Sequence, residues 1–176
     1  MPARPSFASR ASAALVALLA VLALAVSACA PAPTLADLDR QLARPLTSFD
    51  LWWRGEQAAA HHVSRATIDR WLASSPNRLD SAAARSRART WDVSTDLCSF
   101  APDTGPVFDF RVPCIRHDFA WRNLRRIGRS TRARRLAASR RFLEDLRTTC
   151  AARPMGQRTA CRAVAQTYYA AVSAVS

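Results

Sequence analysis

The clearest chemical signal in the sequence is a pair of cysteines that frames a loop and is followed closely by a His-Asp pair. The cysteines are Cys98 and Cys114, and the pair is His117 and Asp118. A disulfide can clamp such a loop to a helix whose first turns carry an imidazole and a carboxylate. With Asp96 just before the first cysteine, two carboxylates and nearby loop carbonyls would offer the oxygen ligands that Ca²⁺ takes. An imidazole beside them could act as a general base on water, so the parts of metal-assisted ester hydrolysis are present.

The first part of the chain, residues 1–28, is predicted to be a signal peptide of the lipoprotein type. Arginines come before an apolar run over residues 13–26, and small residues follow it, which is typical of a secretory signal. The run ends in Val-Ser-Ala-Cys at Cys29, like a bacterial lipobox, although ordinary cleavage near Ala30 is the alternative. We therefore expect an exported protein, either anchored through Cys29 at the cell surface or in the periplasm, or secreted.

The cysteine content supports export. Four cysteines remain after Cys29, and in an exported chain this number suggests two disulfides. The sequence alone permits three pairings among them. A zinc site is the rival explanation, but the C-x₂-C spacing that such sites usually have is absent. The four cysteines are Cys98, Cys114, Cys150 and Cys161.

The charge of the chain indicates an anionic partner. The formal net charge is +13, and every basic side chain is Arg. A GC-rich genome explains the preference for Arg, yet Arg also binds phosphate with two parallel hydrogen bonds. The run of arginines over residues 122–141 is either a patch for anionic headgroups or a solvated helix face. For an exported protein the nearest anion is a phospholipid. We expect a phospholipid membrane surface as partner, no nucleic acid, and a monomeric chain.

The mature chain is predicted to be all-α. Apolar residues recur at helical spacing and Gly is scarce, so no strand is predicted. Residues 29–45 are interpreted as a tether and a short N-terminal helix capped by Thr34, and residues 46–176 as one domain. Trp91 to Pro113 is expected to be a loop, and the short connection around Gly128 predicts an antiparallel helix hairpin. Helices are expected over residues 34–43, 47–63 (capped by Thr47 or Ser48), 64–73, 113–127, 131–150 and 159–175.

Four motifs together resemble the prokaryotic and fungal secreted phospholipase A2 family. They are S-T-D-L-C ending at Cys98, C-x-R-H-D-F-A-W-R-N beginning at Cys114, F-L-E-D-L beginning at Phe142, and T-Y-Y-x-A-V beginning at Thr167. The resemblance extends from about Trp91 to the C-terminus. It implies a phospholipase A2-like helical domain with a central antiparallel two-helix hairpin. It also implies the two disulfides Cys98–Cys114 and Cys150–Cys161.

The resemblance further implies a specific site. The metal ligands would be the carboxylate of Asp96, the backbone carbonyl of Leu97 and the carboxylate of Asp118, with Ca²⁺ as the cofactor. The general base would be His117. The implied activity is calcium-dependent hydrolysis of the sn-2 acyl ester of glycerophospholipids.

This chain departs from the family at the residue that should orient the base. The family has an Asp on the following long helix, and counting back from F-L-E-D-L gives Ser139 at that position. A hairpin that folds near residue 129 also places Ser139 within one helical turn of His117. A hydroxyl cannot stabilise an imidazolium as a carboxylate does, so we expect weakened hydrolysis. The alternative is a non-catalytic calcium- and lipid-binding surface lipoprotein on the same scaffold.

Overall fold

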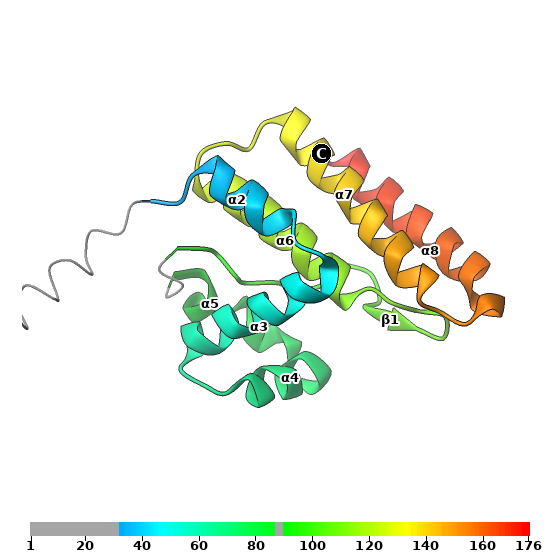
Figure 1. Ribbon diagram of the computed structural model, residues 1–176, viewed down its shortest axis with the longest axis horizontal. Helices are drawn as coiled ribbons and strands as arrows, with labels where there is room; N and C mark the ends of the chain where they lie inside the picture. Colours follow the sequence, from blue (N-terminus) through cyan, green and yellow to red (C-terminus); the bar gives the residue numbers. More distant parts are fainter. Residues whose placement is uncertain (1–31, 87–89) are drawn as a thin grey trace, which may run out of the picture. The chain divides into compact units, whose positions relative to one another are not determined.

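Helices account for most of the described chain, as expected. The computed structural model describes residues 32–86 and 90–176, and Pro33–Ser176 form one compact unit. The predicted signal peptide and Cys29 lie outside the described residues. Within the described ranges, no helix has both the length and the apolar composition needed to cross a bilayer. The elements (Figure 1) are α2 (Leu35–Leu42), α3 (Leu46–His61), α4 (Arg65–Ser74), the 3₁₀ helix η1 (Pro76–Asp80), α5 (Ala82–Ser86), β1 (Thr104–Gly105), β2 (Phe108–Asp109), α6 (Arg111–Arg126), α7 (Arg132–Ala151) and α8 (Met155–Ala174).

Side-chain caps satisfy backbone donors at several helix starts. At α2, the hydroxyl of Thr34 accepts a hydrogen bond from the backbone N–H of Asp37 at 3.2 Å. The carboxylate of Asp37 in turn accepts from the backbone N–H of Thr34 at 2.8 Å, which completes a capping box. At the starts of α4 and α7, the hydroxyls of Ser64 and Thr131 accept from the backbone N–H groups of Thr67 and Arg134. Each cap satisfies a backbone donor that the first helical turn leaves unpaired.

Two helices begin directly after a proline instead. The first residue of α3 follows Pro45, so the expected caps Thr47 and Ser48 are wrong. The first residue of α8 follows Pro154, earlier than the expected start at Thr159. In both prolines φ is close to the value that the ring imposes and ψ is extended, with φ/ψ of −53°/146° for Pro45 and −49°/143° for Pro154. The ring fixes φ at a value that leads the chain into the helix, and no side chain caps either helix start.

The loop expected from Trp91 to Pro113 contains a small sheet that the sequence did not predict. β1 pairs antiparallel with β2, and Gly105 lies opposite Phe108. A Cβ at Gly105 would lie 2.4 Å from the ring of Phe108, so the close approach requires glycine. Strands of two residues are too short to produce a pattern of alternating side chains. The helix that follows also begins earlier, at Arg111.

The predicted hairpin is formed by α6 and α7. α7 contacts α6 and also α8, which lies beside it in Figure 1. Gly128 ends α6 with a left-handed φ of 68°, which glycine adopts without strain. Both implied disulfides are confirmed. Cys98–Cys114 joins the loop to α6, and Cys150–Cys161 joins α7 to α8, with Cα–Cα distances of 5.1 and 5.5 Å.

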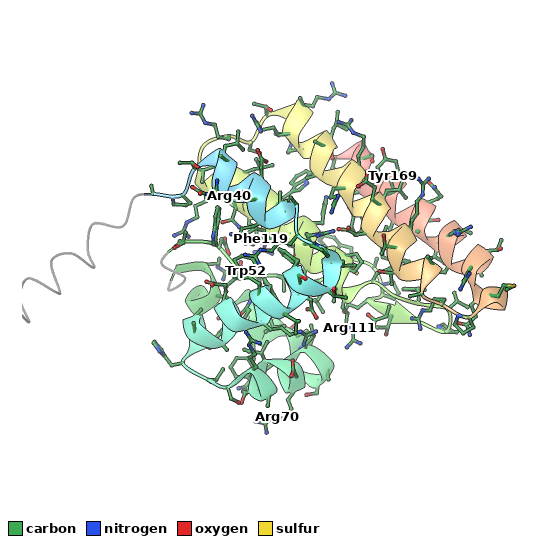
Figure 2. All side chains as sticks on the ribbon, viewed as in Figure 1. Arg40, Trp52, Arg70, Arg111, Phe119 and Tyr169 are labelled. Carbon is green, nitrogen blue, oxygen red and sulfur yellow. A yellow bond between two sulfur atoms is a disulfide. The ribbon has the colours of Figure 1, made fainter. Side chains whose placement is uncertain are left out.

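α6 packs against an apolar cluster on each side. The ring of Phe119 of α6 packs against that of Trp52 of α3 (Figure 2), with centroids 5.3 Å apart. It also packs against Phe49 of α3, at a centroid distance of 5.5 Å. Cys114, near the start of α6, belongs to a second buried cluster that includes Phe142 of α7. Because both sides of α6 are packed, its backbone is held in place. The side chains that project between the two clusters therefore start from fixed positions.

A buried ion pair sets the position of α6 against α7. Arg116 is 2 % exposed and donates from Nε to Oδ2 of Asp145 at 2.7 Å, with a second bond from Nη2 to Oδ1. Its Nη1 donates to the backbone carbonyl of Arg44 at 2.6 Å. The pair therefore joins α6, α7 and the connection between α2 and α3, and Arg116 is one residue away from His117.

Candidate active site

Residues 91–97 form a segment without regular secondary structure that the side chain of Asn123 holds against α6. The Asn123 amide nitrogen donates to the backbone carbonyls of Asp92 and Phe119, both at 2.8 Å. Its amide oxygen accepts from the backbone N–H of Asp92 at 2.9 Å. The fully buried Asn123 therefore pairs with the backbone of Asp92 as a neighbouring strand would.

The next part of this segment is held by α3 and η1. Trp53 Nε1 and Gln57 Nε2 both donate to the carbonyl of Val93, at 2.9 and 2.5 Å. The backbone N–H of Thr95 donates to the carbonyl of Leu79 at 3.2 Å. These bonds are buried, and breaking one would leave an unsatisfied polar group. The segment therefore delivers the residues that follow Thr95 to a defined place beside α6.

Asp96 and Asp118 meet at that place. Oδ2 of Asp118 accepts a hydrogen bond from the hydroxyl of Thr95 at 2.6 Å and one from the backbone N–H of Asp96 at 3.2 Å. Burial raises the pKa of Asp118 to about 8, more than the bond from Thr95 lowers it. Asp118 is thus a mostly buried carboxyl group, with its side chain 15 % exposed, whose hydrogen-bond donors are both neutral.

Leu97 has a strained backbone conformation. Its φ is 61°, in the left-handed region that costs a non-glycine residue about 1–2 kcal/mol. The side chain is 4 % exposed in the core, and the backbone N–H donates to the hydroxyl of Thr95 at 2.9 Å, so packing and a hydrogen bond hold the conformation. Its carbonyl accepts from the backbone N–H of Ser99 at 3.0 Å, which leaves a second lone pair available.

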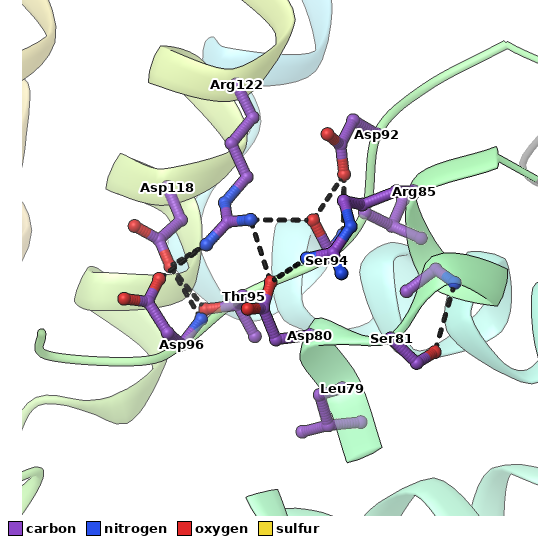
Figure 3. A network of polar contacts seen from close by, with 12 residues as sticks. Leu79, Asp80, Ser81, Arg85, Asp92, Ser94, Thr95, Asp96, Asp118 and Arg122 are labelled. Carbon is purple, nitrogen blue, oxygen red and sulfur yellow. Dashed lines mark hydrogen bonds and ion pairs between the residues drawn. The ribbon is translucent and has the colours of Figure 1, made fainter. Parts of the chain in front are cut away.

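Arg122 links the acidic residues of this region (Figure 3). Its Nη2 donates to Oδ1 of Asp96 at 2.5 Å and lies 3.9 Å from Oδ2 of Asp118. Its Nη1 donates to the carboxylate of Asp80 at 2.8 Å and to the hydroxyl of Ser94 at 2.9 Å. Burial lowers the pKa of Arg122, but Asp118, Asp80 and Asp96 together raise it above its ordinary value.

Sequence reasoning missed Arg122 and Asp80 as members of this region. Arg122 was grouped with the basic run, and Asp80 was given no role. The i, i+4 spacing of Asp118 and Arg122 on one helix face was a usable signal. Asp80 gave none, because its contact with α6 depends on how η1 packs.

His117 lies on the side of α6 that faces α7. Its Nε2 is 3.4 Å from the hydroxyl oxygen of Ser139, so the predicted neighbour is indeed beside it. The imidazole packs against Phe142 and Trp121, with ring centroids 4.9 and 5.6 Å away. Burial lowers the pKa of His117 to about 4, so the ring is neutral at neutral pH. A neutral imidazole in an apolar wall can accept a proton from water.

The structure therefore brings Asp96 and Asp118 together, with Leu97 next to Asp96 in the chain and His117 next to Asp118 on α6. Within the described part of the chain, no hydrogen bond joins His117 to either carboxylate.

Burial raises the pKa of Asp96, but a hydrogen bond from Ser99 and the charge of Arg122 lower it overall. Asp96 is thus ionised at neutral pH.

The residues present suit a hard cation. The only cation near Asp118 in the described residues is Arg122, at 3.9 Å and bonded to Asp96, so a divalent cation beside Asp118 would further stabilise its ionised form. No group of three or more His, Cys, Asp or Glu side chains gathers as metal ligands within residues 32–86 and 90–176. Further ligands would have to be backbone carbonyls and water, which Ca²⁺ accepts readily. Arg122 would compete with the cation for Asp96.

The fold and the cluster around Asp96 and Asp118 define a disulfide-bonded helical protein with a His-Asp pair on its central hairpin. Comparison with known proteins identifies its family. Residues 68–176 match the model of the prokaryotic phospholipase A2 family. The chain is also 33 % identical over 116 residues to a secretory phospholipase A2 of Arthroderma benhamiae. The matched stretch covers 64 % of this chain and 78 % of that relative. The chain belongs to the prokaryotic phospholipase A2 family.

Proposed function

We propose that this protein is a phospholipase A2 that hydrolyses the sn-2 acyl ester of glycerophospholipids at a membrane surface and depends on Ca²⁺. Membership of the phospholipase A2 family supports lipid hydrolysis in general. The observation that carries the finer proposal is the placement on α6 of a neutral imidazole, His117, next to the carboxylate of Asp118, which meets Asp96.

The proposed roles follow from the contacts of each residue. Asp96, the Leu97 carbonyl and Asp118 would hold Ca²⁺. When bound, the cation would stabilise the negative charge that develops on the carbonyl oxygen of the ester. His117 would take a proton from the attacking water and return it to the leaving group. The rings beside His117 limit the access of bulk water to it.

Release of fatty acid tests this proposal. Vesicles of phosphatidylglycerol with a labelled sn-2 chain should yield labelled fatty acid in the presence of Ca²⁺, and none with a chelator. His117→Ala and Asp118→Asn should each abolish release, whereas Arg125→Gln, a change at an exposed residue of α6, should not. Undiminished release by the His117 variant would exclude its role as the base.

A non-catalytic protein that binds calcium and lipid is the second candidate function. The observation that favours it is Ser139, a neutral group beside the imidazole where the family has a carboxylate. Calcium-dependent sedimentation with vesicles, without any release of fatty acid, would establish this alternative.

The two disulfides and the secretory relative support export. We further propose that residues 1–28 are a signal peptide and that Cys29 is acylated and anchors the protein. Residues 29–45 would then be a tether and short helix, and residues 46–176 the catalytic domain. Cys29→Ser should move the protein from the membrane fraction to the soluble fraction. Unchanged retention would contradict the anchor.

A further inference from the structure

Two serine hydroxyls form a chain of hydrogen bonds that ends at the imidazole of His117. The hydroxyl oxygen of Ser139 lies 3.4 Å from Nε2 of His117 and 2.8 Å from the hydroxyl oxygen of Ser176. The hydroxyl of Ser176 also lies 2.7 Å from the backbone carbonyl of Val172. This series of hydrogen bonds therefore runs from α6 through α7 to the residue Ser176, just after α8.

The direction of every bond in this chain is determined by its last member. The carbonyl of Val172 can only accept, so Ser176 must give its single hydroxyl proton to it. Ser139 must then donate to Ser176, because Ser176 has no proton left for that contact. The proton of Ser139 is thereby used as well, so Ser139 can only accept from His117. The proton of the neutral imidazole must therefore be on Nε2.

We infer that Ser176, through Ser139, fixes His117 as the Nε2–H tautomer and leaves the lone pair of Nδ1 free to accept a proton from water. The inference deepens the proposed function and rests on it for its catalytic meaning. Both serines are positioning residues, since each acts on the reaction through His117.

The surroundings of the ring support this assignment. The two rings that pack on His117, Phe142 and Trp121, offer no hydrogen bond to Nε2. Ser139 is fully buried, so bulk water cannot replace its contacts. Within the described residues, no other group bonds to either ring nitrogen. The tautomer is therefore set by Ser139 and by Ser176, which accepts the hydrogen bond that Ser139 donates.

The chain of hydroxyls replaces one part of what a carboxylate would do. A carboxylate accepts from the imidazole without needing a partner, and its charge also stabilises the imidazolium. A hydroxyl accepts reliably only if its own proton is directed elsewhere, and Ser176 provides that direction. The chain thus fixes the tautomer but supplies no counter-charge.

Nitrogen NMR of the full chain, labelled with ¹⁵N-histidine, tests the inference directly. At about pH 7.5 the signals of His117, identified by their loss in His117→Gln, should show Nε2 protonated and Nδ1 unprotonated. In Ser176→Ala, the freed hydroxyl of Ser139 can rotate and donate to Nε2, so the two tautomers should become mixed. Ser176→Thr, which keeps the hydroxyl, should restore the single tautomer.

The control is Ser173→Ala, because the buried hydroxyl of Ser173, three residues before Ser176, has no hydrogen-bond partner among the described residues. This change should leave the tautomer unaltered. Ser176→Ala should lower kcat several-fold and leave KM unchanged, and Ser139→Ala should do the same. A wild-type protein with the proton on Nδ1, or an unaltered tautomer in Ser176→Ala, would overturn the inference. Correct tautomers in a wild type that releases no fatty acid would support the inference and reject the proposed function.

Discussion

Nη2 of Arg122 lies 2.5 Å from Oδ1 of Asp96, so a guanidinium already holds one of the two carboxylates proposed to bind calcium. The same side chain also bonds to Asp80 and lies 3.9 Å from Asp118. In this arrangement Arg122 neutralises part of the acidic cluster. A bound cation would have to share Asp96 with it or displace it.

Replacement of Arg122 by Gln is therefore expected to tighten calcium binding. The pair is partly exposed, with the side chains of Arg122 and Asp96 15 % and 46 % exposed. An ion pair near the surface contributes up to about 1 kcal/mol, which corresponds to a decrease in Kd of about five-fold. Calorimetric titration with Ca²⁺ measures this directly. Arg125→Gln on the same helix controls for the loss of one positive charge. Weaker binding by the Arg122 variant would show that Arg122 positions Asp96 for the metal and does not compete with it.

The stability of the metal-free protein should fall as the pH rises toward about 8, because of Asp118. Burial raises its pKa to about 8, so the folded state keeps a proton that the unfolded state has released above its ordinary pKa of 3.8. His117 has the opposite effect, since burial lowers its pKa from 6.5 to about 4 and stability rises with pH between these values. The pH range from 6.5 to about 9 therefore isolates Asp118.

Urea unfolding in the presence of a chelator tests this. Over this pH range, the urea concentration at the midpoint should fall for the wild type and stay constant for Asp118→Asn. Excess Ca²⁺ should remove the fall in the wild type and have little effect on the variant. A wild-type midpoint that does not change between pH 6.5 and 9 would mean that Asp118 already has a counter-charge in solution.

The buried pair of Arg116 and Asp145 should be costly to break from one side. Burial raises the pKa of Asp145, although the hydrogen bonds from Arg116 lower it. Arg116→Met would leave this carboxylate buried without its partner, at a cost of about 3–5 kcal/mol in the free energy of unfolding. The double variant Arg116→Met with Asp145→Leu should recover most of that loss. Chemical unfolding with both disulfides oxidised measures the two values, and a loss below about 1 kcal/mol in the single variant would contradict the expectation.

Ser139→Asp should raise turnover. A carboxylate next to Nε2 of His117 would raise the pKa of the imidazole from about 4 and stabilise the imidazolium. About 1.4 kcal/mol of such stabilisation is enough for a tenfold increase in kcat. Ser139→Asn is the matched control, since it has the shape of Asp without the charge. If the Asp variant folds normally and gains nothing, proton transfer to His117 does not limit the rate.

The sequence predicted what depends on local patterns and on spacing along one helix hairpin. Counting residues from a turn at residue 129 places Ser139 beside His117, and this holds because α6 is regular up to Arg126 and α7 is regular from Arg132. The Thr34 cap was also recognisable, since the bonds that it makes are within one helical turn. The resemblance added the disulfides, which no spacing rule could pair uniquely.

What the sequence did not predict depends on contacts between distant segments. The role of Arg122 could not be derived, because three of its partners belong to η1 and to the segment before Cys98. The pairing of Arg116 with Asp145 likewise requires knowledge of how α6 is rotated against α7. Ser176 was unpredictable for the same reason, since its contact with Ser139 exists only when α8 packs on α7.

The hydrogen bonds between Asn123 and Asp92 impose a constraint on chain length. One amide aligns the backbone at Asp92 with α6, and the carboxylate of Asp118 bonds to the backbone at Asp96. The stretch between Asp92 and Asp96 thus has a fixed start and a fixed end on a single rigid helix. An inserted or deleted residue there would put a different side chain in the place of Asp96.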